Sequence, residues 1–415
     1  MKKTLNRWVY LVIGTFALVF AGLIYAWSTF APPIAKRFPE WNSAQMSLTA
    51  TIVMCGFCIG GLLGGLLQKK LKPMVIMLMS SVLLILGFLL TSRTNSLVLL
   101  YIGFGVLAGL GSGISYNIIM SVVARWFPDK KGLCSGILLM GFGIGSFLLG
   151  KVYAAVTPED GGDGWRTVFL IFGIVIFAVI VLSSFFMVNP PADWQVPAST
   201  KAGKQKEASF YQELPPGKMM KTRNFWLYIV WTLFMSGAGL MVIFQGNPIA
   251  RETMQITGDA TAAQIGTAAT VVGLISIFNA IGRVIFGFLF DKIGRKLEML
   301  IGGIMFIIGM LLTLVALSSH SMAILVIAYI CNGLAYGSVT PTNAAFAMQF
   351  FGPKNYAVNL PIVNMNLLVA SFSSTLSGAI YDATHSYNLI IYIVIALVVV
   401  GIIVNFLIRK PKDVN

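Results

Sequence analysis

Long apolar runs separated by short polar segments make up most of the chain. A membrane hydrocarbon core about 30 Å thick requires about 20 apolar residues in a helix. The runs are continuous, whereas a membrane β-barrel shows alternating segments of about 10 residues. The pattern therefore predicts twelve transmembrane helices, at about 8–31, 46–67, 74–92, 97–124, 133–154, 167–188, 224–246, 266–290, 298–317, 322–345, 357–381 and 388–409.

A polar segment rich in proline and lysine separates the first six runs from the last six. Such breaker-rich segments are typical of linkers. We expect an N-terminal six-helix bundle at 1–188, a cytoplasmic linker at 189–221 and a C-terminal six-helix bundle at 222–415. The halves also repeat, since Asn6-Arg7-Trp8-Val9-Tyr10 opens the first as Asn224-Phe225-Trp226-Leu227-Tyr228 opens the second. Paired six-helix halves with a site at their interface are a transporter architecture. Pro341 and Pro361 predict kinks in the tenth and eleventh helices.

Composition and charge support a membrane protein. Hydrophobic residues make up 57% of the chain and charged residues 10%, against about 25% charged in soluble proteins. The net charge of +15 lies in short clusters between apolar runs. With the N-terminus in the cytoplasm, cytoplasmic segments hold 22 Lys and Arg and the opposite side 6, as the positive-inside rule requires. We expect a multi-pass protein of the cell membrane (inner or plasma membrane) with both termini cytoplasmic. Nothing indicates a nucleic-acid partner, an enzyme, a cofactor or a metal site.

One basic residue, Arg283, falls in the middle of a predicted span. An arginine there costs about 2.5–3.5 kcal/mol on insertion scales, so such residues are usually functional. Ser276, Asn279 and Gly287 share its helix face. All 14 acidic residues fall in loops or at the ends of predicted spans, so we expect no permanent partner within a span. Because a guanidinium binds a carboxylate bidentately, we expect Arg283 to bind an anion, with Asn279 orienting it. A structural pairing of Arg283 with helix carbonyls or a polar neighbour is the alternative.

Several motifs resemble a known family. Gly287-Phe-Leu-Phe-Asp291-Lys-Ile-Gly294-Arg295-Lys296 resembles the signature loop of the major facilitator superfamily. The first-half copy, Gly64 to Pro73, has Lys69 where the family usually has an acid. The run Arg125-Trp126-Phe127-Pro128-Asp129-Lys130-Lys131-Gly132, together with Tyr25-x-Trp27, resembles the oxalate–formate antiporter group, relatives of the monocarboxylate transporters.

The resemblance implies an all-α membrane fold of two pseudo-symmetric six-helix bundles that hold substrate between them near the midplane. It also implies that Tyr25, Tyr116 and Tyr336 occupy aromatic cavity positions. Trp27 and Asn364 are further candidates for lining the cavity. Cytoplasmic gating is expected from the loops that carry Asp291, Arg295, Arg125, Asp129 and Lys130.

The substrate class follows from the number of fixed charges. Members of the group that move oxalate resemble one another in a lysine of the eleventh span, where this chain has Val363. One guanidinium neutralises a monoanion but leaves a dianion with excess charge at low dielectric, which is costly. We expect a monomeric secondary transporter of small monocarboxylates (lactate-, pyruvate- or formate-like), as an antiporter or a proton-linked symporter. An oxalate–formate exchanger and a proton-coupled sugar or drug carrier of the same fold are the alternatives.

Overall fold

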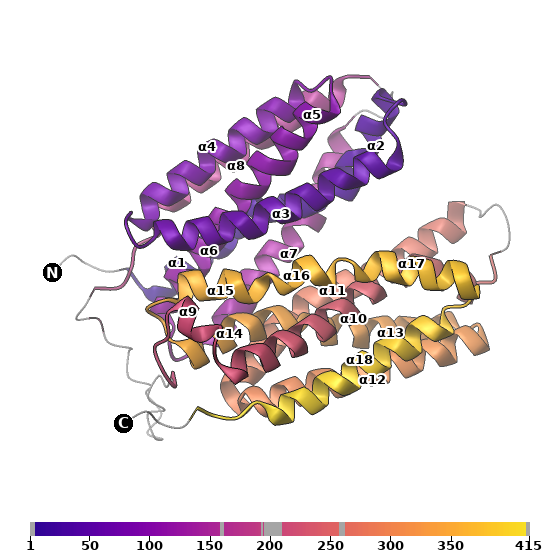
Figure 1. Ribbon diagram of the computed structural model, residues 1–415. Coiled ribbons are helices and arrows are strands. Elements are labelled where there is room, and N and C mark those ends of the chain that lie inside the picture. The colour runs from indigo at the N-terminus through magenta and orange to yellow at the C-terminus, as the bar shows by residue number, and fades with distance from the viewer. Residues whose placement is uncertain (1–4, 158–161, 192–193, 195–209, 257–261, 412–415) are drawn as a thin grey trace. The chain divides into compact units, whose positions relative to one another are not determined.

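The protein is built of helices. The computed structural model (Figure 1) describes residues 5–157, 162–191, 194, 210–256 and 262–411, and these contain no strand. Within this part of the chain, twelve helices are long and apolar enough to cross a membrane. The predicted all-α membrane fold is therefore confirmed. The first and seventh spans, Arg7–Arg37 and Arg223–Thr253, each extend six or more residues beyond the predicted end.

The chain packs into two compact units. The first comprises Met1–Asp129, Ile137–Ser209 and Pro353–Ile362, and the second comprises Lys130–Gly136, Phe210–Gly352 and Val363–Asn415. Each unit thus includes one short segment from the other half of the sequence. The boundaries 1–188, 189–221 and 222–415 remain a prediction. Of the expected linker, 192–193 and 195–209 lie outside the described residues.

The first unit holds the helices of the first six spans. They are α1 (Arg7–Ala21), η1 (Gly22–Ala26), α2 (Trp27–Arg37), α3 (Ser43–Leu67), α4 (Pro73–Ser92), α5 (Leu97–Leu100), the π-helical η2 (Tyr101–Ala108), α6 (Gly109–Trp126), most of α7 (Lys131–Val156) and α8 (Gly164–Ser184). Glycines bring α3 and α6 together, because a Cβ on Gly60 or Gly113 would overlap the backbone of the facing helix. Most of α15 (Tyr356–Asn364) also belongs to this unit.

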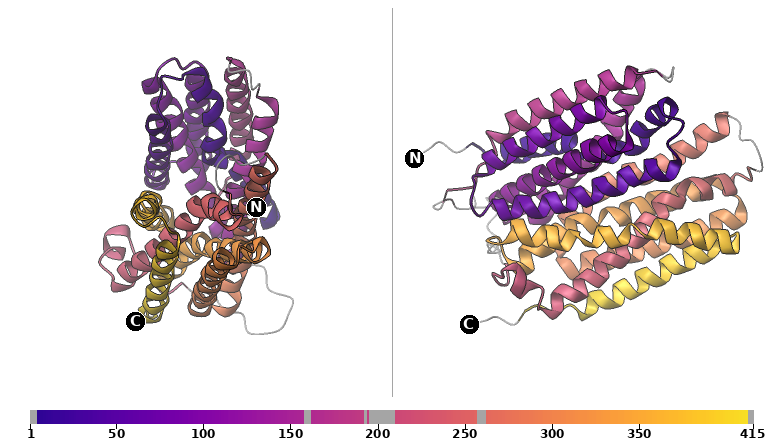
Figure 2. Two further views of the ribbon diagram at one scale, coloured as in Figure 1. Left: turned by 90° about the vertical axis from the view of Figure 1, so that its right-hand side faces the viewer. Right: turned by 45° about the horizontal axis from the view of Figure 1, so that its top comes forward.

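The second unit holds the remaining helices. They are α9 (Pro216–Met219), α10 (Arg223–Thr253), α11 (Ala262–Ile293), α12 (Arg295–Ser319), α13 (Met322–Gly337), α14 (Val339–Phe351), α16 (Asn366–Ala370), α17 (Ser373–Thr384) and α18 (Asn388–Leu407). The last part of the expected linker packs onto this unit, since the backbone N–H of Tyr211 donates to the Gln349 carbonyl at 2.8 Å. Figure 2 shows the helices of each unit from two further directions.

Two prolines explain irregularities in the tenth and eleventh spans. Proline has no N–H to donate to the carbonyl four residues earlier. For Pro341 that carbonyl is Gly337, where α13 ends. For Pro361 it is Ala357, although α15 continues through the proline to Asn364.

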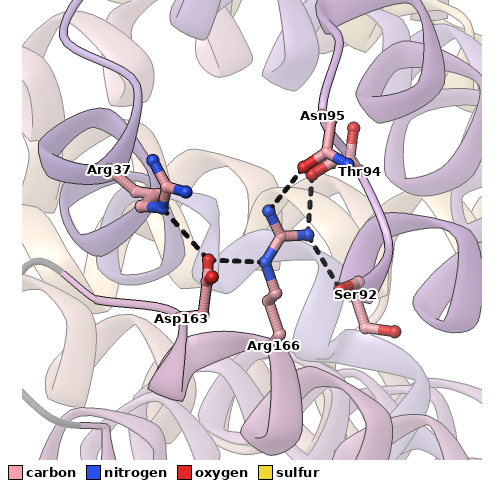
Figure 3. A network of polar contacts seen from close by, with 6 residues as sticks. All are labelled: Arg37, Ser92, Thr94, Asn95, Asp163 and Arg166. Atoms are coloured by element: carbon pink, nitrogen blue, oxygen red, sulfur yellow. Dashed lines mark hydrogen bonds and ion pairs between the residues drawn. The ribbon is translucent and has the colours of Figure 1, made fainter.

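A polar network ties three segments at one end of the first unit (Figure 3). Arg166, in the first turn of α8, donates to the carbonyls of Ser92 and Thr94 at 3.1 and 2.7 Å. Its Nη2 donates to Asn95 at 2.8 Å, and its Nε donates to Asp163 at 2.7 Å. Asp163 also accepts from Arg37 at 3.1 Å. The hydrogen bond from Arg166, and then that from Arg37, lower the pKa of the Asp163 carboxyl.

Candidate functional site

The second unit brings two predicted site residues, Asn279 and Tyr336, close to a third, Arg283. This arginine lies in α11, ten residues before the helix ends at Ile293. Its Nε donates to the side-chain oxygen of Asn279, one turn earlier, at 3.0 Å. The charge of Arg283 also acts on the phenol of Tyr336, near the end of α13. The arrangement holds a half-buried guanidinium with one edge fixed by an amide oxygen.

Glycines position this group by allowing close helix contacts. A Cβ on Gly337 would approach the Asn279 carbonyl and the Arg283 backbone nitrogen. A Cβ on Gly239 of α10 would overlap the ring of Tyr336. The ring therefore lies against the backbone of α10, and α13 lies against α11 beside Arg283. Neither glycine is in the predicted set, because the sequence does not show which faces of these helices meet.

A second group of predicted residues lies in an aromatic cluster of the first unit. Tyr25 lies in η1 with 40% of its surface exposed, and Tyr116 lies buried in α6. Both pack against Phe142 of α7, at ring-centroid distances of 5.3 and 5.2 Å. Phe57 of α3 completes the cluster, 5.2 Å from Tyr116. The sequence does not predict the two phenylalanines as site residues, because nothing in an apolar run distinguishes a residue of such a cluster from a lipid-facing one.

Two other predicted residues lie apart from these groups. Trp27 is 7% exposed, donates its indole N–H to the Met46 carbonyl at 3.0 Å and packs against Phe104. Asn364, at the end of α15, accepts a hydrogen bond from Asn343 of α14 at 3.3 Å. Trp27 therefore makes contacts typical of a core residue, and Asn364 belongs to a buried polar network.

The second-half signature loop binds the start of α7 through Asp291. Its two carboxylate oxygens accept from the backbone N–H groups of Gly132 and Leu133 at 2.9 and 2.8 Å. The first N–H groups of a helix lack partners within the helix and carry partial positive charge. Asp291 therefore satisfies two of these donors and adds a favourable charge. Gly132 and Gly287 allow this approach, because a Cβ on either would overlap the carbonyl of the other.

Three of the other predicted gating residues bind side chains from distant parts of the sequence. Asp129 forms a bidentate ion pair with Arg7 at 2.6 and 2.9 Å. Arg125 donates to Asn189 at 2.9 Å. Arg295 donates to the side chain of Asn405 at 2.6 Å and to the Ile408 carbonyl at 3.0 Å. Lys130 is half-buried just before α7.

One expectation needs correction. The sequence predicts every acidic residue in a loop or at a span end, and we therefore expect no buried carboxylate within a span that could pair with Arg283. Glu298 does lie in the first turn of α12, but its side chain is fully buried. Position near a helix end did not imply exposure, because the start of α12 contacts Thr342 of α14 and Asn405 of α18 and lies near Tyr228 of α10.

Together these features define a multi-pass helical membrane protein whose second unit groups Arg283, Asn279 and Tyr336. The sequence matches the family model of the Major Facilitator Superfamily over residues 11–366 and 255–415. The chain therefore belongs to this superfamily. The similar proteins are transporters, and the chain is a transporter and not an enzyme.

Similar proteins agree with this assignment. The chain is 28% identical to the oxalate:formate antiporter of Oxalobacter formigenes, over 85% of this chain and 80% of that protein. It is 24% identical to monocarboxylate transporter 13 of Rattus norvegicus, over 90% and 81%. The solved structure of the proton:xylose symporter XylE superposes with a TM-score of 0.69 at 15% identity, over 98% of each chain. The structural likeness concerns the fold alone.

Proposed function

We propose that this protein transports small monocarboxylates across a cell membrane by alternating access, with Arg283 binding the carboxylate. The observation that carries the proposal is the half-buried guanidinium within α11, oriented by Asn279. The hydrogen bond from Nε to Asn279 orients the plane of the guanidinium, and the two Nη groups form the fork at its end. A planar pair of N–H donors fits the two oxygens of a carboxylate.

The relatives favour the same substrate class. Two similar proteins are named for oxalate and formate and for monocarboxylates. Tyr336, on which the charge of Arg283 acts, is proposed as a substrate-binding residue of the second unit, and Tyr25 and Tyr116 are proposed as substrate-binding residues of the first. Both termini are proposed to be cytoplasmic, because the basic loops predict this orientation, and the protein is proposed to function as a monomer.

Uptake of labelled substrate into proteoliposomes tests the proposal. Arg283→Gln should lower uptake of lactate, pyruvate or formate by about 10- to 100-fold, since hydrogen bonds to charged groups contribute about 1.5–3 kcal/mol. Arg283→Lys keeps the charge but loses the planar fork, so it should retain part of the activity. Arg251→Gln, at the exposed end of α10, is the matched control and should transport normally. Normal uptake by Arg283→Gln would refute the assignment.

Oxalate exchange is the second candidate, favoured by the similarity to the oxalate:formate antiporter. Val363 is buried and apolar, so this chain offers no second cation at that position. Competition assays separate the two candidates. Formate, lactate or pyruvate should displace labelled substrate at lower concentration than oxalate, and the reverse order would establish the oxalate exchanger.

A further inference from the structure

Glu298 is a fully buried carboxyl without an ion pair in the described part of the chain. Its Oε1 accepts a hydrogen bond from the Thr342 hydroxyl of α14 at 3.0 Å. Its Oε2 is buried and has no hydrogen-bond partner among the described residues. The ion pairs Arg7–Asp129, Arg37–Asp163 and Arg166–Asp163 lie in the first unit, and Glu298 takes part in none of them. A buried acid is normally paired or fully hydrogen-bonded, so Glu298 needs an explanation.

The nearest cation does not supply the missing partner. Arg295 lies one turn earlier on α12 and acts on Glu298 electrostatically, as does Tyr228 of α10. The guanidinium of Arg295 is directed to α18 instead, where it binds Asn405 and the Ile408 carbonyl. Burying an ionised carboxylate that lacks a hydrogen-bonded ion pair is costly, and such a group takes up a proton instead.

Glu298 is joined to a polar network that reaches the predicted substrate residue Asn364. Thr342, which binds Glu298, is followed on α14 by Asn343. Asn343 accepts from Tyr228 and Thr232 of α10, both at 2.8 Å, and donates to Asn364 at 3.3 Å. Helix α14 begins directly after the interruption at Ser338. A movement of this helix therefore changes the surroundings of Glu298 and of Asn364 together.

We propose that Glu298 is the site that binds a co-transported proton, which makes the protein a proton–monocarboxylate symporter. The inference rests on the proposed function, because it takes the substrate charge from binding at Arg283. The proton binds Glu298 Oε2 from water on one side of the membrane and leaves to water on the other. Ionisation requires that α12 and α14 admit water to the carboxyl, so proton release follows a change in helix packing.

Charge balance explains why the two solutes move together. With substrate and proton bound, the anion neutralises Arg283 and Glu298 is neutral. With neither bound, Arg283 and the Glu298 carboxylate carry opposite charges, so their sum is again zero. A carrier with only one of the two bound has a net charge in the membrane, which is unfavourable. The two neutral forms are therefore the ones that change conformation.

Glu298→Gln tests the proposal because glutamine keeps the size and the acceptor for Thr342 but cannot ionise. The variant should exchange internal for external labelled monocarboxylate in proteoliposomes, since the loaded form stays neutral. It should lose net uptake driven by an inward proton gradient, because its empty form keeps the charge of Arg283. The exposed Glu40→Gln is the matched control and should retain both activities.

A second variant separates proton binding by Glu298 from a structural role of its hydrogen bond with Thr342. Thr342→Val removes the hydrogen bond but leaves the carboxyl, so it should keep net uptake with an altered pH profile. In infrared spectra, a protonated-carboxyl band should be present in wild type and Thr342→Val and absent from Glu298→Gln. The same loss of net uptake in both variants, or loss of exchange in Glu298→Gln, would overturn the inference in favour of a structural role.

Failure of the inference and failure of the proposed function give different results. If the wild type exchanges no monocarboxylate, the proposed function fails. If the wild type exchanges monocarboxylate but shows no proton-driven uptake, only the inference fails. Proton-driven net uptake by Glu298→Gln at the wild-type rate would overturn the inference as well and leave the proposed function intact.

Discussion

The two copies of the signature loop hold their helix partners by different chemistry. In the second copy, 287–296, the Asp291 carboxylate binds the first N–H groups of α7. In the first copy, 64–73, the corresponding position is the exposed Lys69. There, Asn117 of α6 donates from its side-chain nitrogen to the Gly61 carbonyl at 2.8 Å and to the Ala357 carbonyl at 2.7 Å.

Both copies share a close contact at a glycine, whereas the polar contact beside that glycine differs between them. A Cβ on Gly65 would overlap the Ala357 carbonyl, as one on Gly287 would overlap the Gly132 carbonyl. In the second copy, the polar contact is made by the charge of Asp291 at the N-terminus of α7. In the first copy, the polar contact is made by the neutral side-chain amide of Asn117, which donates to the Ala357 carbonyl. Pro361 has no N–H that could bind this carbonyl within the helix. The two contacts should therefore respond differently to substitution and to salt.

The largest effect is expected where the copies agree. Gly65→Val and Gly287→Val should each destabilise the unit that contains them by about 3 kcal/mol, because overpacking a close contact forces backbone shifts. Thermal unfolding of the purified variants measures the loss. Gly273→Val, on the same helix as Gly287, is the control, since its Cβ would meet nothing within 4 Å. An equal loss in the control would show that valine itself perturbs the helix.

A smaller effect is expected from Asn117→Ala. It removes both hydrogen bonds and leaves the Ala357 carbonyl unsatisfied, at a cost of about 2 kcal/mol. Pro361→Ala supplies an N–H that can bond this carbonyl within α15. The double variant should therefore lose less stability than the sum of the two single variants. Additive losses in thermal unfolding would show that the freed carbonyl is not what Asn117 serves.

The smallest effect is expected from Asp291→Asn, which keeps an acceptor oxygen but removes the charge. It should destabilise the contact by about 1 kcal/mol, a typical value for a helix N-cap. The deficit should shrink at high salt, because salt screens the charge–dipole interaction. Lys69→Gln, which removes the charge from the other copy, should leave the unfolding midpoint nearly unchanged. A midpoint as low as that of Asp291→Asn would contradict the comparison.

The sequence predicted the helices well because membrane spans are continuous apolar segments of fixed length. The spans 73–92 and 388–407 begin and end within two residues of the prediction. The sequence also predicted that Arg283 and Asn279 lie on one helix face, since a spacing of four residues is one turn. Their hydrogen bond agrees with that geometry.

Contacts between helices were the part that the sequence could not supply. Nothing in the apolar runs marks Phe57 and Phe142 as neighbours of Tyr25 and Tyr116. The burial of Glu298 likewise depends on helices far away in the sequence that cover the start of α12. Periodicity predicts which face of a helix is polar, but not which other helix meets that face.

The network around Arg166 and Asp163 has a consequence for motion. Arg166 holds the end of α4 through two carbonyls, and Asp163 holds the end of α2 through Arg37. None of the three helix ends can separate from the others without breaking an ion pair or a charge-assisted hydrogen bond. A transport cycle in this protein should therefore displace α2, α4 and α8 as one rigid body, and local bending is left to the interrupted helices of the tenth and eleventh spans.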